Sequence, residues 1–186
     1  VNAVSYRDLE VSVAGLLSAE AEDKRFVYRT AASFVRVRGG IAPRPQLTHA
    51  DLDVNPAGGL VVVGSHVRKT TQQLEALRTL SHLAWVELDV RALLRPSQRK
   101  GVISEATDGV SRAIETGRDA VLYTSREPIV EHPTLTPLQI GERISDALVR
   151  VVSGLGATPG WVVAKGGITA SVIATRALGI ERADVL

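Results

Sequence analysis

Between residues 60 and 178, short apolar segments alternate four times with segments of helical periodicity, and this alternation leaves few folds open to the chain. The apolar segments are LVVVG (60–64), AWVEL (84–88), AVLY (120–123) and WVVA (161–164). Their length and composition are typical of buried strands, whereas Leu74, Leu77 and Leu80 recur on one face of a helix. Strands that alternate with helices form a largely parallel sheet through right-handed crossovers. We therefore predict an α/β, Rossmann-like, mostly parallel sheet with helices on both faces.

Capping residues and glycines indicate where the helices of this region begin and end. We predict helices at 71–80, 104–117, 137–154 and 170–178. Thr70 or Thr71 is expected to cap the first of them. The clearest start is Thr136-Pro137-Leu138-Gln139, in which the threonine caps, the proline takes the first helical position and the glutamine completes a capping box. The segment that follows the second strand is expected to be a loop through Pro96.

The first 48 residues lack this alternation. Ser5 and Asp8 form a capping-box pattern, which predicts an amphipathic helix that ends in a charged run. Residues 26–28 are a strand candidate, and Thr30 is placed to cap a brief helix before the pair Gly39-Gly40. These elements are too few to build a core, so we predict a short helical segment that belongs to a second domain.

Residues 41–59 have the composition of a linker. They contain Pro43, Pro45 and Pro56 together with polar residues and the pair Gly58-Gly59. Prolines favour an extended chain, and glycines interrupt regular structure. We place the domain boundary in this segment, with residues 49–59 as the linker.

The composition of the 186-residue chain excludes several classes of function. Cysteine is absent, which excludes disulfides, thiolate metal sites and cysteine nucleophiles. The net charge is only +2 and no basic stripe with interleaved aromatic residues occurs, so nucleic acid is not an expected partner. The four histidines are too scattered for a local metal motif, and we find no secretory signal and no apolar run of membrane-spanning length. We expect a cytoplasmic protein without a membrane partner.

Three of the four predicted strands end in small or hydroxylated residues, namely Gly64-Ser65, Thr124-Ser125 and Gly166-Gly167. In a parallel sheet these ends share one edge, where free N–H groups and positive helix ends attract phosphate. Several such turns can present donors to one polyphosphate while apolar strand ends and loops hold a base, and Lys165 brings a positive charge to the same edge. These features favour a nucleotide ligand, although each turn alone is also consistent with an ordinary tight turn. The chain contains neither a P-loop motif nor a GxGxxG motif.

Several short segments of the sequence resemble segments of the four-carbon acid sugar kinase family. In chain order, GSHVRKTTQQLEAL, VLYTSRE and VVAKGGITASVIATRALGI resemble its nucleotide-binding half. NAVSYRDLEV and YRTAASFVRVRGGI resemble the end of its amino-terminal, sugar-acid-binding half. The resemblance assigns residues 1–48 to the sugar-acid-binding domain, 49–59 to a linker and 60–186 to the nucleotide-binding domain. It implies phosphorylation by ATP, with Mg²⁺, of a four-carbon sugar acid such as a threonate, an erythronate or an oxo-tetronate.

The resemblance also implies nucleotide contacts in two turns. The matching residues are Gly64, Ser65, Gly166, Gly167, Ile168 and Thr169. A third contact of the family lies in a later proline-glycine turn, so we expect a domain truncated at its carboxyl end and a chain that is inactive alone. Many relatives carry an acidic residue where this chain has Ile168, which puts in doubt a carboxylate there that would hold Mg²⁺ or ribose. The resemblance assigns no catalytic residue.

Other functions remain open on the sequence alone. One alternative is a non-catalytic, nucleotide-binding regulatory module, and another is an interaction domain whose glycine turns bind nothing. Arg29 is a candidate partner for the carboxylate of the acid, and His66 and Lys69 are candidates for phosphate contacts, although each residue also suits a solvated surface. ATP binding separates the first two functions from the third, and turnover of a sugar acid separates the kinase from the regulatory module. The oligomeric state is open, and a homodimer is compatible with the sequence.

Overall fold

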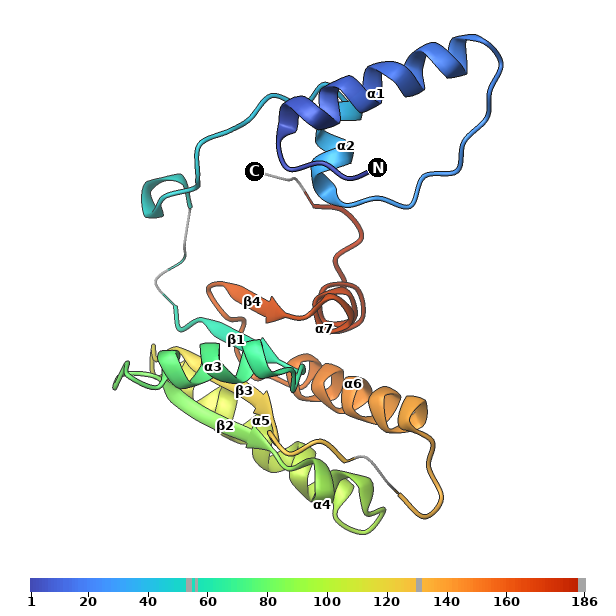
Figure 1. Ribbon diagram of the computed structural model, residues 1–186. Helices are drawn as coiled ribbons and strands as arrows, with labels where there is room; N and C mark the ends of the chain where they lie inside the picture. Colours follow the sequence, from blue (N-terminus) through green and yellow to red (C-terminus); the bar gives the residue numbers. More distant parts are fainter. Residues whose placement is uncertain (53–54, 56, 130–131, 184–186) are drawn as a thin grey trace. The chain divides into compact units, whose positions relative to one another are not determined.

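The computed structural model describes residues 1–52, 55, 57–129 and 132–183. The chain divides into two compact units, Val1–Leu52 and Asp53–Leu186 (Figure 1). The division falls inside the proline- and glycine-containing segment 41–59. Each unit is described by itself below.

The first unit contains two helices and no core of its own. Helix α1 (Tyr6–Ala21) begins with the expected capping box, in which the Asp8 N–H donates to Ser5 Oγ and the Ser5 N–H donates to Asp8 Oδ2. Helix α2 (Ala32–Arg38) ends at Gly39, and a short 3₁₀ turn, η1 (His49–Asp51), follows. Val13 is the one buried residue among the described side chains of this unit.

Two predictions for the first unit are wrong. Residues 26–28 form no strand, because the described part of this unit contains no second strand with which they could pair. Their aromatic rings pack instead, with Tyr28 lying between Phe26 and Phe34. Ala31, and not Thr30, is the N-cap of α2, and no side-chain hydrogen bond caps that helix.

The second unit contains a four-stranded parallel sheet, which confirms the predicted α/β fold. Its strands are β1 (Leu60–Val63), β2 (Ala84–Leu88), β3 (Ala120–Thr124) and β4 (Val162–Lys165), in the order β2-β3-β1-β4. Val63 of β1 is level with Tyr123 of β3 and with Lys165 of β4. Strands β1 and β4 therefore end at the same height and β3 ends one residue later, so the turns that follow these three strands leave from one edge.

Helices cover both faces of this sheet (Figure 1). Helix α3 (Arg68–Leu77) packs Leu74 against one face, beside Val63 and Val121. Helices α5 (Arg99–Glu115) and α6 (Pro137–Ser153) cover the other face, where the largest buried cluster includes Leu60 and Leu122. Burying a leucine of this kind stabilises the fold by about 1.5–3 kcal/mol. The alternation of side chains along β1 thus sends successive residues into two different helix layers.

Helix starts agree with the sequence where the signal is local. The Thr136 hydroxyl accepts from the Gln139 N–H, the Gln139 side chain accepts from the Thr136 N–H, and Pro137 opens α6, as predicted. The N-cap of α3, in contrast, is Val67. Thr70 lies inside the helix, and only 4% of its surface is exposed. The prediction that Thr70 or Thr71 caps α3 is therefore wrong.

Two further boundaries differ from prediction. The expected loop through Pro96 contains a short helix, α4 (Val90–Leu94), capped by Asp89, and α5 begins at Arg99 rather than at Ser104. The last helix begins three residues early, as α7 (Gly167–Val172) and the π-helix η2 (Ile173–Ala177), because Gly166 completes the turn with φ = 110°.

Among the described residues, no helix combines the length and the apolar character needed to cross a bilayer.

Candidate functional site

A cavity of about 520 Å³ lies at the carboxyl ends of β1 and β4. Helix α6 forms one wall, and α7 with η2 forms another; Figure 1 shows β4 leading into α7 beside α6. Six of the residues that line the cavity are those singled out in the sequence, namely Gly64, Ser65, Gly166, Gly167, Ile168 and Thr169. The fold thus brings together two turns that are about a hundred residues apart in the chain.

The two helices that leave these turns have free N–H groups at their starts. The first N–H groups of a helix have no partner within the helix, and within the described part of the chain no side chain caps α3 or α7. Ser5, Asp89 and Thr136 cap α1, α4 and α6, whereas α2 and α5 lack a side-chain cap as α3 and α7 do. The first residues of α7, namely Gly167, Ile168 and Thr169, line the cavity, and their uncapped N–H groups favour an anionic ligand there.

The three glycines of the two turns are present for different reasons. A Cβ atom on Gly64 would lie 2.5 Å from the Oγ1 atom of Thr169, so Gly64 allows the two turns to touch. Gly166 has a φ of 110°, which side-chain-bearing residues rarely adopt. A Cβ atom on Gly167 would meet no heavy atom within 4 Å, and Gly167 lines the cavity. The backbone at Gly167 is therefore open to close approach by a ligand.

The remaining wall of the cavity is largely apolar. Its apolar side chains come from α6 and from the α7 segment, and they are Leu138, Ile144, Leu148, Ile168 and Val172. Ile168 is 75% exposed although it is apolar, because its side chain stands on the surface of the cavity and not in the core. An apolar wall beside backbone donors suits a ligand with one flat apolar part and one anionic part.

The third predicted turn does not contribute to this cavity. The Thr124 hydroxyl donates to the Gly64 carbonyl at 3.4 Å, and the Ser125 hydroxyl accepts from the Val90 N–H at 3.1 Å. These hydroxyls join neighbouring strand ends, and both residues line a smaller cavity of about 310 Å³ next to the first. The expectation that all three turns present donors to one polyphosphate is therefore corrected to two turns.

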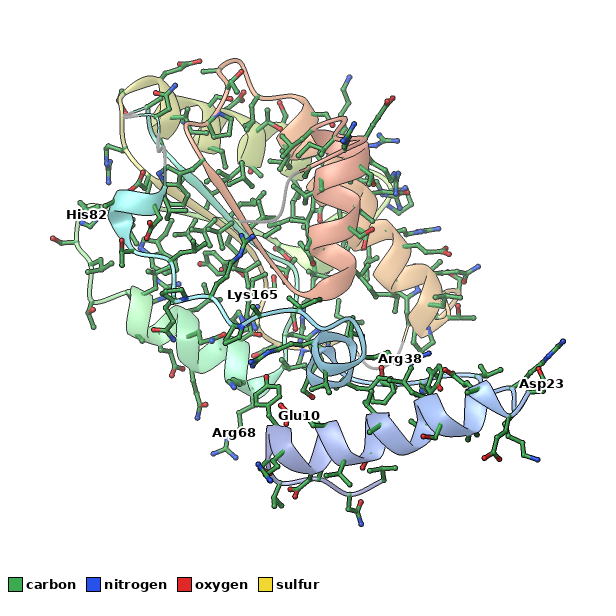
Figure 2. The ribbon with its side chains drawn as sticks, turned by 90° about the horizontal axis from the view of Figure 1, so that it is seen from above. Glu10, Asp23, Arg38, Arg68, His82 and Lys165 are labelled. Carbon is green, nitrogen blue, oxygen red and sulfur yellow. The ribbon has the colours of Figure 1, made fainter. Side chains whose placement is uncertain are left out.

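The other charged candidates are placed unequally. His66 lines both cavities. Lys69 is exposed on α3 and lines neither of them, and Arg29 is exposed in the first unit. Lys165, labelled in Figure 2, is level with Val63 and so shares the face of the sheet that carries α3, away from α6 and α7. The predicted positive charge of Lys165 is at the correct edge but does not line the cavity.

Sequence reasoning missed Arg126, which follows β3. Its Nη2 atom donates to the Ser65 carbonyl oxygen at 2.7 Å and to Thr71 Oγ1 at 2.9 Å. Arg126 lines neither cavity, so it holds the Ser65 turn from behind. The segment VLYTSRE contains Arg126, but no local sequence pattern indicates a hydrogen bond to a turn 61 residues away.

Ionisable groups are sparse in the larger cavity. Glu142 is the one carboxylate among its described lining residues, and Arg176 is paired with Asp146 at 2.7 Å. In the part of the chain that the structure describes, no group of three or more histidine, aspartate or glutamate side chains could hold a metal ion. Besides backbone N–H groups, the described lining offers the hydroxyls of Ser65, Ser145 and Thr169 as donors.

Comparison with known proteins agrees with this geometry. None of the curated proteins compared with this chain is similar enough to count as a match. Residues 60–186 match a family model described as a nucleotide-binding C-terminal domain, which is the domain of four-carbon acid sugar kinases. Because the matched segment covers more than half of the chain, the chain belongs to the four-carbon acid sugar kinase family, and residues 60–186 are its nucleotide-binding domain.

Proposed function

We propose that the larger cavity binds ATP and that the protein phosphorylates a hydroxyl group of a four-carbon sugar acid, of the threonate, erythronate or oxo-tetronate type. The observation that carries this proposal is the meeting of the Gly64-Ser65 turn and the 166–169 turn in one cavity. Its volume of about 520 Å³ lies within the range of about 300–1,000 Å³ that is usual for small-ligand sites. Membership of a kinase family supports ATP as the ligand.

The proposed placement follows from the two kinds of wall. The phosphates lie at the uncapped start of α7, where Gly167 and Ile168 present their backbone, and beside the turn of Ser65 that precedes α3. The base packs against the apolar side chains of Leu138 and Ile144 on α6. ATP supplies the phosphoryl group, and the residues of this chain contribute by orienting the phosphates and by offsetting their charge, which are the main contributions of proteins to phosphoryl transfer.

We propose that Mg²⁺ enters the site bound to the nucleotide. Magnesium is commonly held by substrate phosphates, a few waters and one or two carboxylates, so a dedicated cluster of protein ligands is not required. Glu142 is the carboxylate of this chain that lines the cavity.

We assign residues 1–48 to the domain that binds the sugar acid. The assignment is supported by their resemblance to that domain and by the lack of a core in the described part of the first unit. The exposed guanidinium of Arg29 is the proposed partner for the carboxylate of the acid. We propose the cytoplasm, where ATP is supplied, as the location of the protein.

Calorimetric titration with Mg-ATP tests the nucleotide site. We expect saturable binding by the unchanged chain and a loss of affinity of about tenfold or more, or about 1.4 kcal/mol, in Gly167→Val. Gly167 lines the cavity, and a Cβ added there would meet no protein atom within 4 Å. Gly101→Val is the matched control, because a Cβ on Gly101 in α5 also meets nothing within 4 Å.

The Gly101→Val control separates a loss of the nucleotide site from a general effect of replacing glycine with valine. Wild-type affinity in Gly101→Val, with melting temperatures in both variants no lower than that of the unchanged chain, is the expected outcome. Equal binding by Gly167→Val and the unchanged chain would contradict the proposed site. Ser65→Leu, which fills the other turn, is expected to reduce affinity in the same way.

Turnover separates the kinase from the regulatory module. The assay uses protein that carries a complete acceptor domain and follows ADP release with each of the three classes of acid. We expect ADP release that depends on the acid. Binding of Mg-ATP without acid-dependent ADP release would favour a regulatory, nucleotide-binding role instead.

A further inference from the structure

Arg126 connects three elements at the edge of the sheet that carries the larger cavity. Its Nη2 atom donates to the Ser65 carbonyl oxygen at 2.7 Å and to Thr71 Oγ1, in α3, at 2.9 Å. Its Nη1 atom lies 3.5 Å from the carbonyl oxygen of Thr124, the last residue of β3. One planar guanidinium group therefore joins the end of β3, the turn after β1 and the first turns of α3.

The bond to Ser65 determines how the turn faces the cavity. The chain contains no cis peptide bond among its described residues, and in a trans peptide the C=O of one residue points opposite to the N–H of the next. Because the Ser65 carbonyl points to Arg126, the N–H of His66 points away from Arg126. Ser65 and His66 both line the cavity, whereas Arg126 does not. Arg126 thereby orients a backbone donor on the cavity side of the turn.

Arg126 also brings charge to this position. Its side chain is partly buried, and among the described residues it makes no ion pair within 4.0 Å. Its Nε atom is buried and has no hydrogen-bond partner. Burial lowers the pKa of Arg126, while the nearby Glu87 and Tyr123 raise it, and a guanidinium remains protonated in proteins at neutral pH. A positive charge behind the turn is screened less than a fully exposed one.

We propose that Arg126 is a positioning residue for the nucleotide phosphates: it holds the Ser65 turn so that the His66 N–H is available to them, and it adds a positive charge behind that turn. This inference rests on the proposed function, because it assigns the Ser65 turn to the phosphates of ATP. It goes beyond that function by giving a role to a residue that lies outside the cavity.

A purely structural role for Arg126 gives a different result in binding experiments. A structural brace affects every ligand of the domain alike and acts through stability. A positioning residue for phosphates affects nucleotides in proportion to the phosphates that reach the turn. The dependence of binding on the number of phosphates therefore distinguishes the two roles.

The test uses the whole chain and titrates ATP, ADP and AMP, each with Mg²⁺, into Arg126→Met, Arg126→Lys and the unchanged protein. We expect Arg126→Met to weaken ATP binding by about tenfold or more, because the turn loses both the bond that orients it and the charge behind it. The loss is expected to be smaller for ADP and smallest for AMP. Lysine keeps the charge but not the planar fork, so Arg126→Lys is expected to restore part of the affinity.

Arg91→Met is the matched control, because Arg91 is exposed and pairs with the exposed Glu127 rather than with the turn. It is expected to bind all three nucleotides as the unchanged chain does. Equal losses for ATP, ADP and AMP in Arg126→Met, or unchanged ATP binding, would overturn the inference and leave the proposed function intact. If the unchanged chain bound none of the nucleotides, both would be overturned.

Discussion

Glycines stand at both ends of the parallel sheet, but the two ends require them for different reasons. At the amino end, a Cβ atom on Gly58 would lie 2.3 Å from the Arg118 carbonyl oxygen, and one on Gly160 would lie 2.5 Å from the Ala57 carbonyl oxygen. At the carboxyl end, a Cβ atom on Gly167 would meet no heavy atom within 4 Å. Both ends are rich in glycine, but the carboxyl end has open space at Gly167, whereas Gly58 and Gly160 at the amino end have none.

This difference separates glycines needed for packing from a glycine that leaves space for a ligand. Protein interiors are close-packed, so a position without room for a Cβ needs glycine for the fold alone. Gly167 has room for a side chain and its φ lies outside the glycine-favouring region, so packing does not require glycine there. Unlike Gly101, which also has room, Gly167 lines the proposed nucleotide site. Substitutions at the two ends should therefore affect different properties.

The largest expected effect is on stability at the amino end. Gly58→Ala places a methyl group against the Arg118 carbonyl oxygen and the Cα of Ile114, and neither backbone atom can rotate away. We expect a loss of about 3 kcal/mol or more in the free energy of unfolding, measured by urea denaturation. Gly101→Ala, in open space on α5, is the control and is expected to keep full stability. Equal stability of the two variants would refute the packing account of Gly58.

Gly64 lies at the carboxyl end but should behave as a packing glycine of moderate cost. Gly64→Ala brings a Cβ to 2.5 Å from Thr169 Oγ1, and that side chain can be removed. We expect a loss of about 1–3 kcal/mol, partly recovered in the double variant with Thr169→Ala. A double-mutant cycle in urea measures the coupling. Additive losses would show that the two turns do not constrain each other.

The capped and uncapped helix starts give an effect of about 1 kcal/mol. Thr136→Ala removes the cap of α6 and should cost about 1 kcal/mol of stability without changing the affinity for Mg-ATP.

Val67→Asp adds a cap to α3 and should gain about 0.5–1 kcal/mol of stability, but its negative charge near the proposed phosphate site should weaken Mg-ATP binding. Melting curves and calorimetry on the same samples check both quantities. A Val67→Asp variant that gained stability and bound Mg-ATP more tightly would contradict the proposed site.

The smallest expected effect on stability is that of Gly167→Ala. Alanine restricts the unfolded chain more than glycine does, so the variant should be as stable as the unchanged chain or more stable by about 0.4–1 kcal/mol. Thermal unfolding of the two proteins measures this difference. A clear loss of stability would mean that Gly167 has a packing role after all.

The sequence predicted the elements whose signals are local. The strand beginning at Leu60 and the capping box at Thr136 each depend on neighbours within a few residues, and the structure confirms both. The alternation of strands and helices was enough for the parallel sheet, and therefore for the meeting of its strand ends at one edge.

What the sequence did not predict depends on contacts between distant residues. Thr70 was expected at a cap but is buried in α3, and the hydroxyls of Thr124 and Ser125 bond to neighbouring strand ends instead of facing the cavity. Arg126 acts on a turn 61 residues away. A hydroxyl or guanidinium group looks the same in the sequence whether it contacts a ligand or the backbone of another strand.

The most direct test of the nucleotide site is an NMR titration of the labelled chain with Mg-ATP, because it reports on both ends of the sheet in one experiment. We expect the amide resonances of the carboxyl-end turns to shift and saturate, namely those of Ser65, His66, Gly167 and Ile168. The amide resonances of Gly58, Gly59 and Gly160 at the amino end should not move. Saturable shifts at the amino end with none at the carboxyl end would contradict a nucleotide site at the carboxyl end.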